Sequence, residues 1–301
     1  MKSKQLVAMA ALALLVALPA RAAEVVSSNI VGYNKITLKS RLTMMAASFQ
    51  NVGAANSTIS LSQIVPGDSV TPIDWSDDDL PFGSSLLIWN GSSYIGGTYY
   101  WTGEVPREIG AEMESDLGMP VGSYNNIWVD DQYEPVGDIS FPAGTAFWIQ
   151  DDNRSATQLG SITVSGEVVP STANRSVDAD TRLTMMGYTY PKEISTDQLI
   201  VSDLPGIDWN DDDLPFGSSL LKWNGSSYIG GTLYWTGEVP REIGSEMETD
   251  LGLESGSYNN IWVNDQYEPD SLSIGVGEAF WIQNSDTSQK ATITFPELPN
   301  P

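Results

Sequence analysis

The clearest pattern along the chain is a pair of short β-prone runs on either side of an Asn-Gly dipeptide. The first run is 85–89 and the second is 92–101, which is rich in Tyr and Trp. Asn90-Gly91 between two such runs predicts a β-hairpin, because both central positions of a type I′ turn need positive φ. The same pattern recurs around Asn224-Gly225, so we expect a second hairpin there.

Other β-prone segments are bounded by turn residues at the spacing typical of sandwiches and small barrels. They are 36–49, 126–129, 146–150, 161–164 and 291–295.

One short helix is predicted in each half, over 106–117 and 240–251. Proline suits the first turn of a helix, and apolar residues recur at every fourth position after it. Gly110 weakens the pattern, since glycine is a poor helix former. We therefore expect an all-β protein with at most one short helix in each half.

The second half of the chain repeats the first, which is the strongest signal of domain organisation in the sequence. Residues 73–135 align without a gap with 207–269, and 54 of the 63 positions are identical. Each unit has the length of an ordinary domain. The sequence thus predicts two tandem β-sandwich or barrel-like domains, 23–165 and 166–301. Extra residues in the first copy, 51–72, are rich in Ser, Asn, Gly and Thr and predict a surface loop.

The first 22 residues have the features of a secretory signal peptide. Lys2 and Lys4 precede an uncharged apolar run over 6–18, and Ala20-Arg21-Ala22 provides the small residues of a cleavage site. The run is shorter than the roughly 20 residues that span a bilayer. We expect export of the mature chain to the periplasm, the cell surface or the medium, without membrane insertion after cleavage.

Charge and two missing residue types narrow the possible functions. Of 14 basic and 39 acidic residues, residues 1–22 contain three basic and no acidic ones, so the mature net charge is −28. Such a polyanion repels phosphate backbones, which argues against nucleic acid as a partner. The absence of Cys and His excludes disulfides, Ser-His-Asp catalysis and the common zinc sites.

Two clusters of aspartates, one in each half, are the candidate metal site. Several carboxylates in one turn can supply the oxygen ligands that Ca²⁺ requires, although the spacing is not that of an EF-hand. The alternative is a solvated loop whose Asp side chains accept hydrogen bonds from nearby backbone amides. The residues are Asp74, Asp77, Asp78 and Asp79, with Asp208, Asp211, Asp212 and Asp213 in the second half.

Aromatic residues of the predicted hairpins are candidates for a sugar-binding platform. Flat rings on a sheet can stack on sugars while nearby Asp and Asn bind the hydroxyls. The alternative is that these rings fill the core, since Trp and Tyr are common in strands and bury large areas. The candidates are Trp89, Tyr94, Trp101, Trp223, Tyr228 and Trp235.

Carboxylates near these aromatics allow a glycosidase hypothesis, which needs two carboxyl groups about 5 or 9 Å apart. They are Glu104, Glu108, Glu112 and Glu114, with Glu238, Glu242, Glu246 and Glu248 as counterparts. An ordinary surface ion pair, such as Arg107 with Glu108, is the preferred explanation. No catalytic residue is assigned, and we do not expect an enzyme.

The segment Ser28-Asn29-Ile30-Val31-Gly32-Tyr33 and the Gly-x-x-Phe-Trp motifs at 144–148 and 277–281 resemble a loose group of exported bacterial proteins. The resemblance implies an exported β-rich architecture and no activity. We expect a non-catalytic surface, matrix or adhesive protein whose two domains raise avidity for a polysaccharide or cell-envelope component. The alternatives are a carbohydrate-binding protein, with or without Ca²⁺, and a carboxylate-based glycan-active enzyme.

Overall fold

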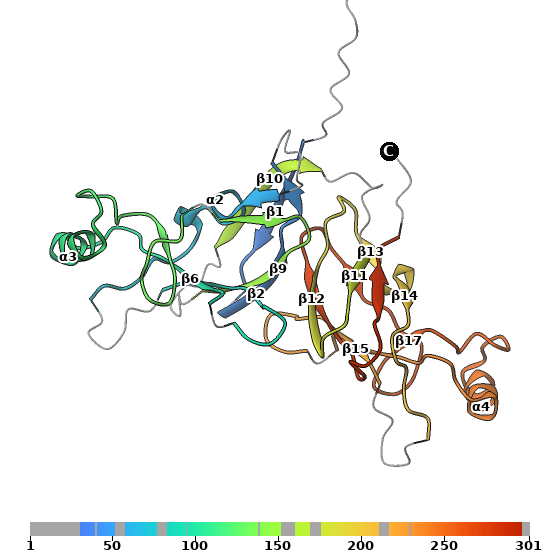
Figure 1. Ribbon diagram of the computed structural model, residues 1–301. Coiled ribbons are helices and arrows are strands. Elements are labelled where there is room, and N and C mark those ends of the chain that lie inside the picture. The colour runs from blue at the N-terminus through green and yellow to red at the C-terminus, as the bar shows by residue number, and fades with distance from the viewer. Residues whose placement is uncertain are drawn as a thin grey trace, which may run out of the picture. The chain divides into compact units, whose positions relative to one another are not determined.

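Strand pairing in this all-β protein closes separately within each half of the chain. The computed structural model describes residues 31–39, 41–51, 58–76, 83–94, 96–137, 139–151, 160–168, 176–210, 217–228 and 230–296. Every strand pair among these residues joins strands within 31–168 or within 176–296. We call these two parts repeat 1 and repeat 2 (Figure 1). The predicted signal peptide lies outside the described residues.

Each repeat contains the same five-stranded antiparallel sheet. In repeat 1 the order is β2-β9-β5-β6-β7, and in repeat 2 it is β12-β19-β15-β16-β17. The strands of repeat 1 are β2 (Arg41–Ala46), β5 (Ser85–Leu87), β6 (Thr98–Trp101), β7 (Trp128–Val129) and β9 (Ala146–Asp151). Those of repeat 2 are β12 (Leu183–Gly187), β15 (Ser219–Leu221), β16 (Thr232–Trp235), β17 (Trp262–Val263) and β19 (Ala279–Gln283).

A three-stranded sheet and a two-stranded ribbon complete each repeat. Repeat 1 has β1 (Val31–Thr37), β10 (Ser161–Val168) and β3 (Phe49–Gln50) in one sheet, and β4 (Thr58–Ser60) with β8 (Ser140–Pro142) in the ribbon. Repeat 2 has β11 (Ser176–Asp178), β20 (Thr292–Thr294) and β14 (Ile200–Ser202), with β13 (Ile194–Ser195) and β18 (Ser273–Ile274). In repeat 1 the sheet strand β3 precedes the ribbon strand β4 along the chain, whereas in repeat 2 the sheet strand β14 follows the ribbon strand β13. β10 continues through the predicted boundary at 165–166.

The main core of each repeat lies between its five-stranded and three-stranded sheets. In repeat 1, Met45, Phe147 and Ile149 of the larger sheet are buried with Ile162 and Val164 of β10. Successive side chains of a strand point to opposite faces, so Met44 and Trp148 emerge on the other face of the same sheet. The five-stranded sheet therefore has two apolar faces, only one of which faces the core of its own repeat.

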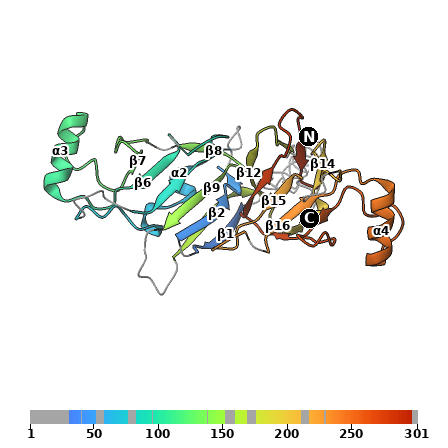
Figure 2. The same cartoon turned by 90° about the horizontal axis from the view of Figure 1, so that it is seen from below.

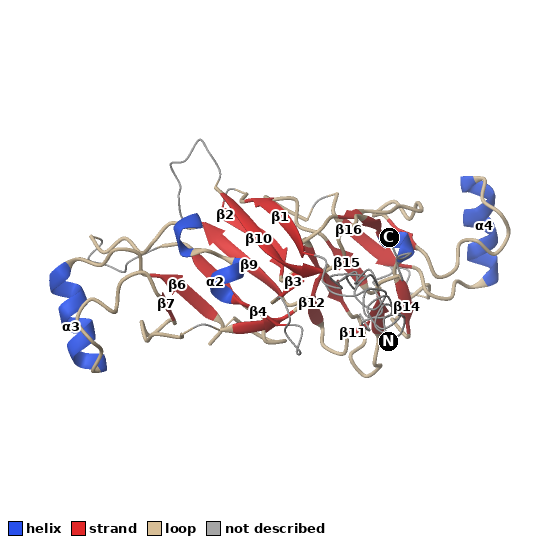
Figure 3. Cartoon of the chain, turned by 90° about the horizontal axis from the view of Figure 1, so that it is seen from above, coloured by secondary structure: helices blue, strands red, loops and turns tan. Residues whose placement is uncertain are grey.

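The predicted helices are confirmed as α3 (Arg107–Leu117) and α4 (Arg241–Leu251). Figures 2 and 3 show α3 beyond the β6–β7 end of its sheet. Pro106 and Pro240 occupy the N-cap positions, and Gly118 and Gly252 end the helices in the left-handed conformation. Gly110 is buried where it packs near Val105. No helix in the described part of the chain is both long and apolar enough to cross a bilayer.

The prediction of a surface loop over 51–72 is wrong for the described residues 58–70. This segment forms β4, the one-turn helix α2 (Leu61–Ile64) and the 3₁₀ turn η1 (Gly67–Ser69), so repeat 1 has a second short helix. Ile59, Leu61, Ile64 and Val65 are fully buried in the core. These four apolar residues are scattered among polar ones, which is why composition alone suggested a loop. The counterpart in repeat 2 is the 3₁₀ turn η2 (Thr196–Gln198).

Both predicted hairpins form, as β5–β6 and β15–β16, but the tight turn centred on Asn90-Gly91 is wrong. Ten residues, 88–97, connect β5 to β6. Gly91 has a φ of 101°, whereas Asn90 does not have a positive φ. The Asn90 Oδ1 atom accepts hydrogen bonds from the backbone N–H groups of Ser92 (2.9 Å) and Ser93 (2.8 Å). The asparagine side chain thus replaces the backbone carbonyl that would close a two-residue turn.

Candidate functional site

Four of the six predicted platform residues lie in an apolar cluster to which both repeats contribute. Trp89, Tyr94, Trp223 and Tyr228 are half-buried there. The cluster forms on the second apolar face of each five-stranded sheet, and we call it the inter-repeat cluster. Its fully buried members are Met44, Ala46, Ala146, Trp148, Ala279 and Trp281, and its partly buried members also include Leu42, Leu87, Leu183, Met185 and Leu221.

One hydrogen bond in this cluster occurs twice, once from each repeat. The Trp89 Nε1–H group donates to the Leu183 carbonyl oxygen (3.0 Å), and the Trp223 Nε1–H group donates to the Leu42 carbonyl oxygen (3.0 Å). These are equivalent bonds, since 89 corresponds to 223 and 42 to 183. Each bond satisfies a polar group that would otherwise be costly to bury.

The tryptophan rings of the cluster also pack in equivalent pairs. Trp89 meets Trp281 edge to face, with 5.5 Å between centroids and 86° between planes. Trp148 meets Trp223 at 5.6 Å and 84°. Edge-to-face packing of this kind is favourable beyond the area that it buries. The rings that could stack on a sugar therefore stack on one another across the two repeats.

The tyrosines of the cluster are uncharged at neutral pH. Burial raises the pKa of Tyr94 to about 12, and a side-chain hydrogen bond with Trp148 partly opposes this shift. Burial raises the pKa of Tyr228 as well, opposed by a hydrogen bond with Trp281. Desolvation disfavours the phenolate. The cluster is thus an uncharged aromatic contact within a strongly acidic chain.

The other two predicted platform residues pack inside their own repeats. Trp235 is 8% exposed and its ring centroid lies 5.0 Å from that of Trp262. The equivalent pair in repeat 1, Trp101 and Trp128, is separated by 5.5 Å. Gly67 of η1 lies directly against Trp101, because a Cβ atom built there would be 2.0 Å from Cζ2 of the indole. The extra segment of repeat 1 therefore covers Trp101.

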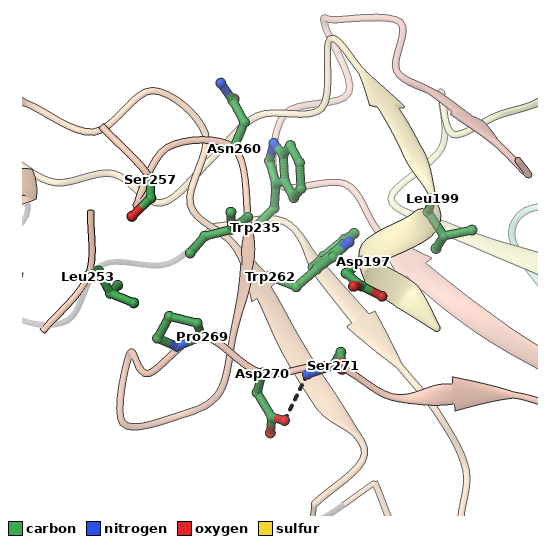
Figure 4. Close-up of a pocket in the computed structure, with 11 residues that line it drawn as sticks. Asp197, Leu199, Trp235, Leu253, Ser257, Asn260, Trp262, Pro269, Asp270 and Ser271 are labelled. Carbon is green, nitrogen blue, oxygen red and sulfur yellow. Dashed lines mark hydrogen bonds between the residues drawn. The ribbon is translucent and has the colours of Figure 1, made fainter. Parts of the chain in front are cut away.

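A cavity of about 430 Å³ lies beside the Trp235–Trp262 pair in repeat 2 (Figure 4). In the described part of repeat 2, η2 is followed by β14 instead of an equivalent of the Gly67 turn. Asp197 and Asp270 are in the cavity wall and align with Ser62 and Val136 of repeat 1. Sequence reasoning missed this site, because the residues that line it come from separate turns and form no motif.

The buried indole nitrogen of Trp262 has no hydrogen-bond partner among the described residues, and neither has that of Trp128. Because the feature occurs in both repeats, it belongs to the shared tryptophan pair and not to the cavity.

Most of the two predicted Ca²⁺ clusters cannot be placed. Asp77, Asp78, Asp79, Asp211, Asp212 and Asp213 lie outside the described residues. Asp74 is exposed, and its Oδ1 atom accepts hydrogen bonds from the Ser76 hydroxyl (2.6 Å) and N–H (3.0 Å), which lower the pKa of Asp74. Asp208 accepts the Asn210 N–H in the same way (3.1 Å). Within the described ranges no three acidic side chains are grouped as metal ligands would be. The Ca²⁺ site stays a prediction.

The carboxylates of α3 and α4 fall into an exposed and a buried set. Glu108 and Glu112, like their counterparts in α4, are exposed. Glu114 is 4% exposed, and its Oε1 atom accepts the Tyr124 N–H (3.0 Å). Glu248 is 6% exposed and accepts the Tyr258 N–H (3.1 Å). Each buried carboxylate thus anchors the loop that follows its helix.

Comparison of the chain with protein-family models, curated proteins and solved structures found no match. The resemblance to the group of exported proteins stays a prediction. The fold places the chain in the class of all-β proteins with internally repeated sheets.

Proposed function

We propose that this chain is an exported, non-catalytic surface, matrix or adhesive protein that presents two copies of one acidic surface. The observation that carries the proposal is the placement of the aromatic residues. Trp89, Trp148, Trp223 and Trp281 contact one another across the repeats. They support a rigid connection between two equivalent units better than a ligand-binding face.

The duplicated surface comprises α3 with its following loop and α4 with its following loop. Exposed Glu108 and Glu112 recur as Glu242 and Glu246. Two equal surfaces on one chain raise the avidity for a repetitive target by roughly 10²–10⁴ when both bind at once. A polysaccharide or cell-envelope component that offers cations or hydroxyl groups suits such an acidic surface, whereas nucleic acid does not.

Charge reversal in one or both copies tests this proposal. The variants are E108K/E112K in α3, E242K/E246K in α4 and the combination of all four. Their binding is measured by cosedimentation with the envelope and extracellular polysaccharide of the producing cells. We expect each double variant to bind at least tenfold more weakly and the fourfold variant to lose binding. V31A, at a position of β1 that is 62% exposed and lies outside this surface, is the control. Unchanged binding by the fourfold variant, or no binding by the wild type, contradicts the proposal.

The cavity beside Trp235 supports a second candidate function, carbohydrate binding by repeat 2 alone. Small-molecule sites are concave and combine apolar walls with a few polar groups. Two indole rings and the carboxylates of Asp197 and Asp270 make such a wall (Figure 4). The Asp270 Oδ1 atom accepts the Ser271 N–H (2.7 Å), which holds one carboxylate in place.

A glycan array read with the wild type and with D197N/D270N tests the second candidate. We expect binding to neutral sugars that is lost in the variant and insensitive to the α3 and α4 charge reversals. S62A in repeat 1, at the position that aligns with Asp197, is the matched control. Binding that survives D197N/D270N would assign the sugar contact to another surface.

A further inference from the structure

The aromatic contacts between the repeats have the symmetry of a two-fold interface, whereas the Asn34–Val276 and Ala46–Gly277 hydrogen bonds have no equivalent among the described residues. Exchanging the repeats turns the Trp89–Leu183 bond into the Trp223–Leu42 bond, and the Trp89–Trp281 pair into the Trp223–Trp148 pair. In a two-fold interface the same patch serves on both sides, so the patch is complementary to itself. Each repeat of this chain therefore carries a face shaped to receive a copy of that face.

The paired positions of the inter-repeat cluster carry the same residue types, with one exception. Leu42, Met44, Trp89, Tyr94 and Trp148 match Leu183, Met185, Trp223, Tyr228 and Trp281. The exception is Ala46 of β2, whose counterpart in β12 is Gly187. Both residues are buried.

Gly187 leaves no room for a second methyl group. A Cβ atom at Gly187 would lie 2.6 Å from the Cβ atom of Ala46 and 2.5 Å from the carbonyl oxygen of Gly144. Both distances are far below van der Waals contact. The interface thus accommodates one methyl group at this pair of positions. A pair of repeat 1 faces would bring two, and a pair of repeat 2 faces would bring none.

We propose that the aromatic face of repeat 2 binds a second copy of repeat 2, and that Ala46 prevents the same homotypic pairing of repeat 1. A second repeat 2 is the expected partner because the contacts are self-complementary and because Gly187 adds no methyl group to the interface. Within the intact chain, repeat 1 holds this face because the chain connection gives it a high effective concentration. The homotypic pair forms once the two repeats are separated.

Cleavage of the folded chain tests the proposal. A protease site is placed within 169–175, between β10 and β11, and the purified full-length protein is cut after folding. Separated fragments are then measured by size-exclusion chromatography with light scattering. We expect the repeat 2 fragment to form a dimer and the repeat 1 fragment to remain a monomer. We expect A46G to convert repeat 1 into a dimer and W223A to abolish the repeat 2 dimer. A monomeric repeat 2 fragment, folded or unfolded, overturns the proposal.

Substitutions in the uncut chain test the same contact without separated fragments. We expect G187A, which places two methyl groups in the interface, to lower the melting temperature. A46G/G187A removes the contact between the two methyl groups but leaves the new methyl group against the Gly144 carbonyl oxygen, so we expect it to recover part of the loss. V121A is the control. A G187A protein that melts like the wild type, or one that A46G does not rescue, contradicts the steric selection by Ala46.

Discussion

Trp223 joins the two repeats through one directed hydrogen bond and one ring contact. W223F keeps an aromatic ring but removes the Nε1–H donor, and the carbonyl oxygen of Leu42 then loses this hydrogen bond. Loss of such a hydrogen bond costs about 0.5–1.5 kcal/mol of unfolding free energy. Chemical denaturation should show a loss of this size for W223F, whereas V121A should change stability by less than about 0.5 kcal/mol. An unchanged denaturation midpoint for W223F would mean that the bond contributes nothing.

Three buried tyrosines determine how stability responds to alkaline pH. Burial raises the pKa values of Tyr94, Tyr124 and Tyr258 to about 12, from an ordinary value of 10.0. Between these values the unfolded chain loses the phenolic protons that the folded chain keeps, so stability falls as pH rises. Below pH 10 these groups are protonated in both states and the curve is flat.

Melting temperatures measured from pH 8 to 12 should therefore be constant up to about pH 10 and then fall. Absorbance at 295 nm should show a late group of tyrosines that ionises together with unfolding. Y94F should reduce the slope above pH 10, because one of the linked groups is gone. If all twelve tyrosines ionised near pH 10 in the folded protein, the burial of these hydroxyls would be disproved.

The sequence predicts that Trp89 and Trp223 form a sugar platform or fill the core, and it cannot indicate what they contact. Each packs on a tryptophan from the other copy, far away in the chain, at 281 or 148. The local sequence pattern indicates that the ring packs against another group. Only the tertiary fold decides whether that group belongs to a ligand or to the protein itself.

Helix α3 was predictable because its ends and its apolar spacing agree. Pro106 fixes the start, Gly118 ends the helix with a φ of 66°, and Ile109 and Met113 pack on a small core with Tyr124. Gly110 contradicted this pattern but does not interrupt the helix, since one central glycine costs only about 1 kcal/mol relative to alanine.

The two glycines of α3 should respond in opposite ways to replacement by alanine. A Cβ atom at Gly110 would lie 3.7 Å from the Val105 side chain, an ordinary contact, so G110A should stabilise by about 0.5–1 kcal/mol. Gly118 is left-handed, so G118A should destabilise by about 1 kcal/mol. Urea denaturation measures both, and G244A and G252A repeat the test in α4. Destabilisation by G110A would mean that the helix packs more tightly there.

The segment 58–70 shows where element prediction from sequence failed. Ile59, Leu61 and Ile64 are fully buried, but polar neighbours separate them along the chain. Their counterparts Ile194 and Leu199 are also buried, whereas Thr196 stands in place of Leu61. In the fold Gly67 of this segment lies against Trp101.

Ca²⁺ binding by the two aspartate clusters stays a prediction, and its effect would be on the stability of the whole chain. If the Asp77–Asp79 and Asp211–Asp213 segments bind Ca²⁺ in the native state alone, the ion stabilises by mass action, about 2.7 kcal/mol at one hundred times the dissociation constant. The melting temperature should then rise when millimolar Ca²⁺ is added and return to its original value when a chelator removes the ion. D78N/D212N should remove the response without changing the melting temperature in chelator. Equal melting of the wild type in Ca²⁺ and in chelator would eliminate the metal site.

The inter-repeat cluster makes the two repeats thermodynamically dependent on each other. Each repeat completes its own sheets, yet each leaves an apolar face of its larger sheet that only the other repeat covers. Unfolding one repeat therefore exposes the face of the other and lowers its stability. Calorimetry should give a single transition for the wild type, because nearest-neighbour interfaces couple repeats that are individually marginal. W89A/W223A should divide it into two transitions at lower temperature, whereas G110A/G244A, which lies outside the interface, should leave one. Two transitions in the wild type would show that each repeat is stable without its neighbour, and that the aromatic contact adds little to the stability of either.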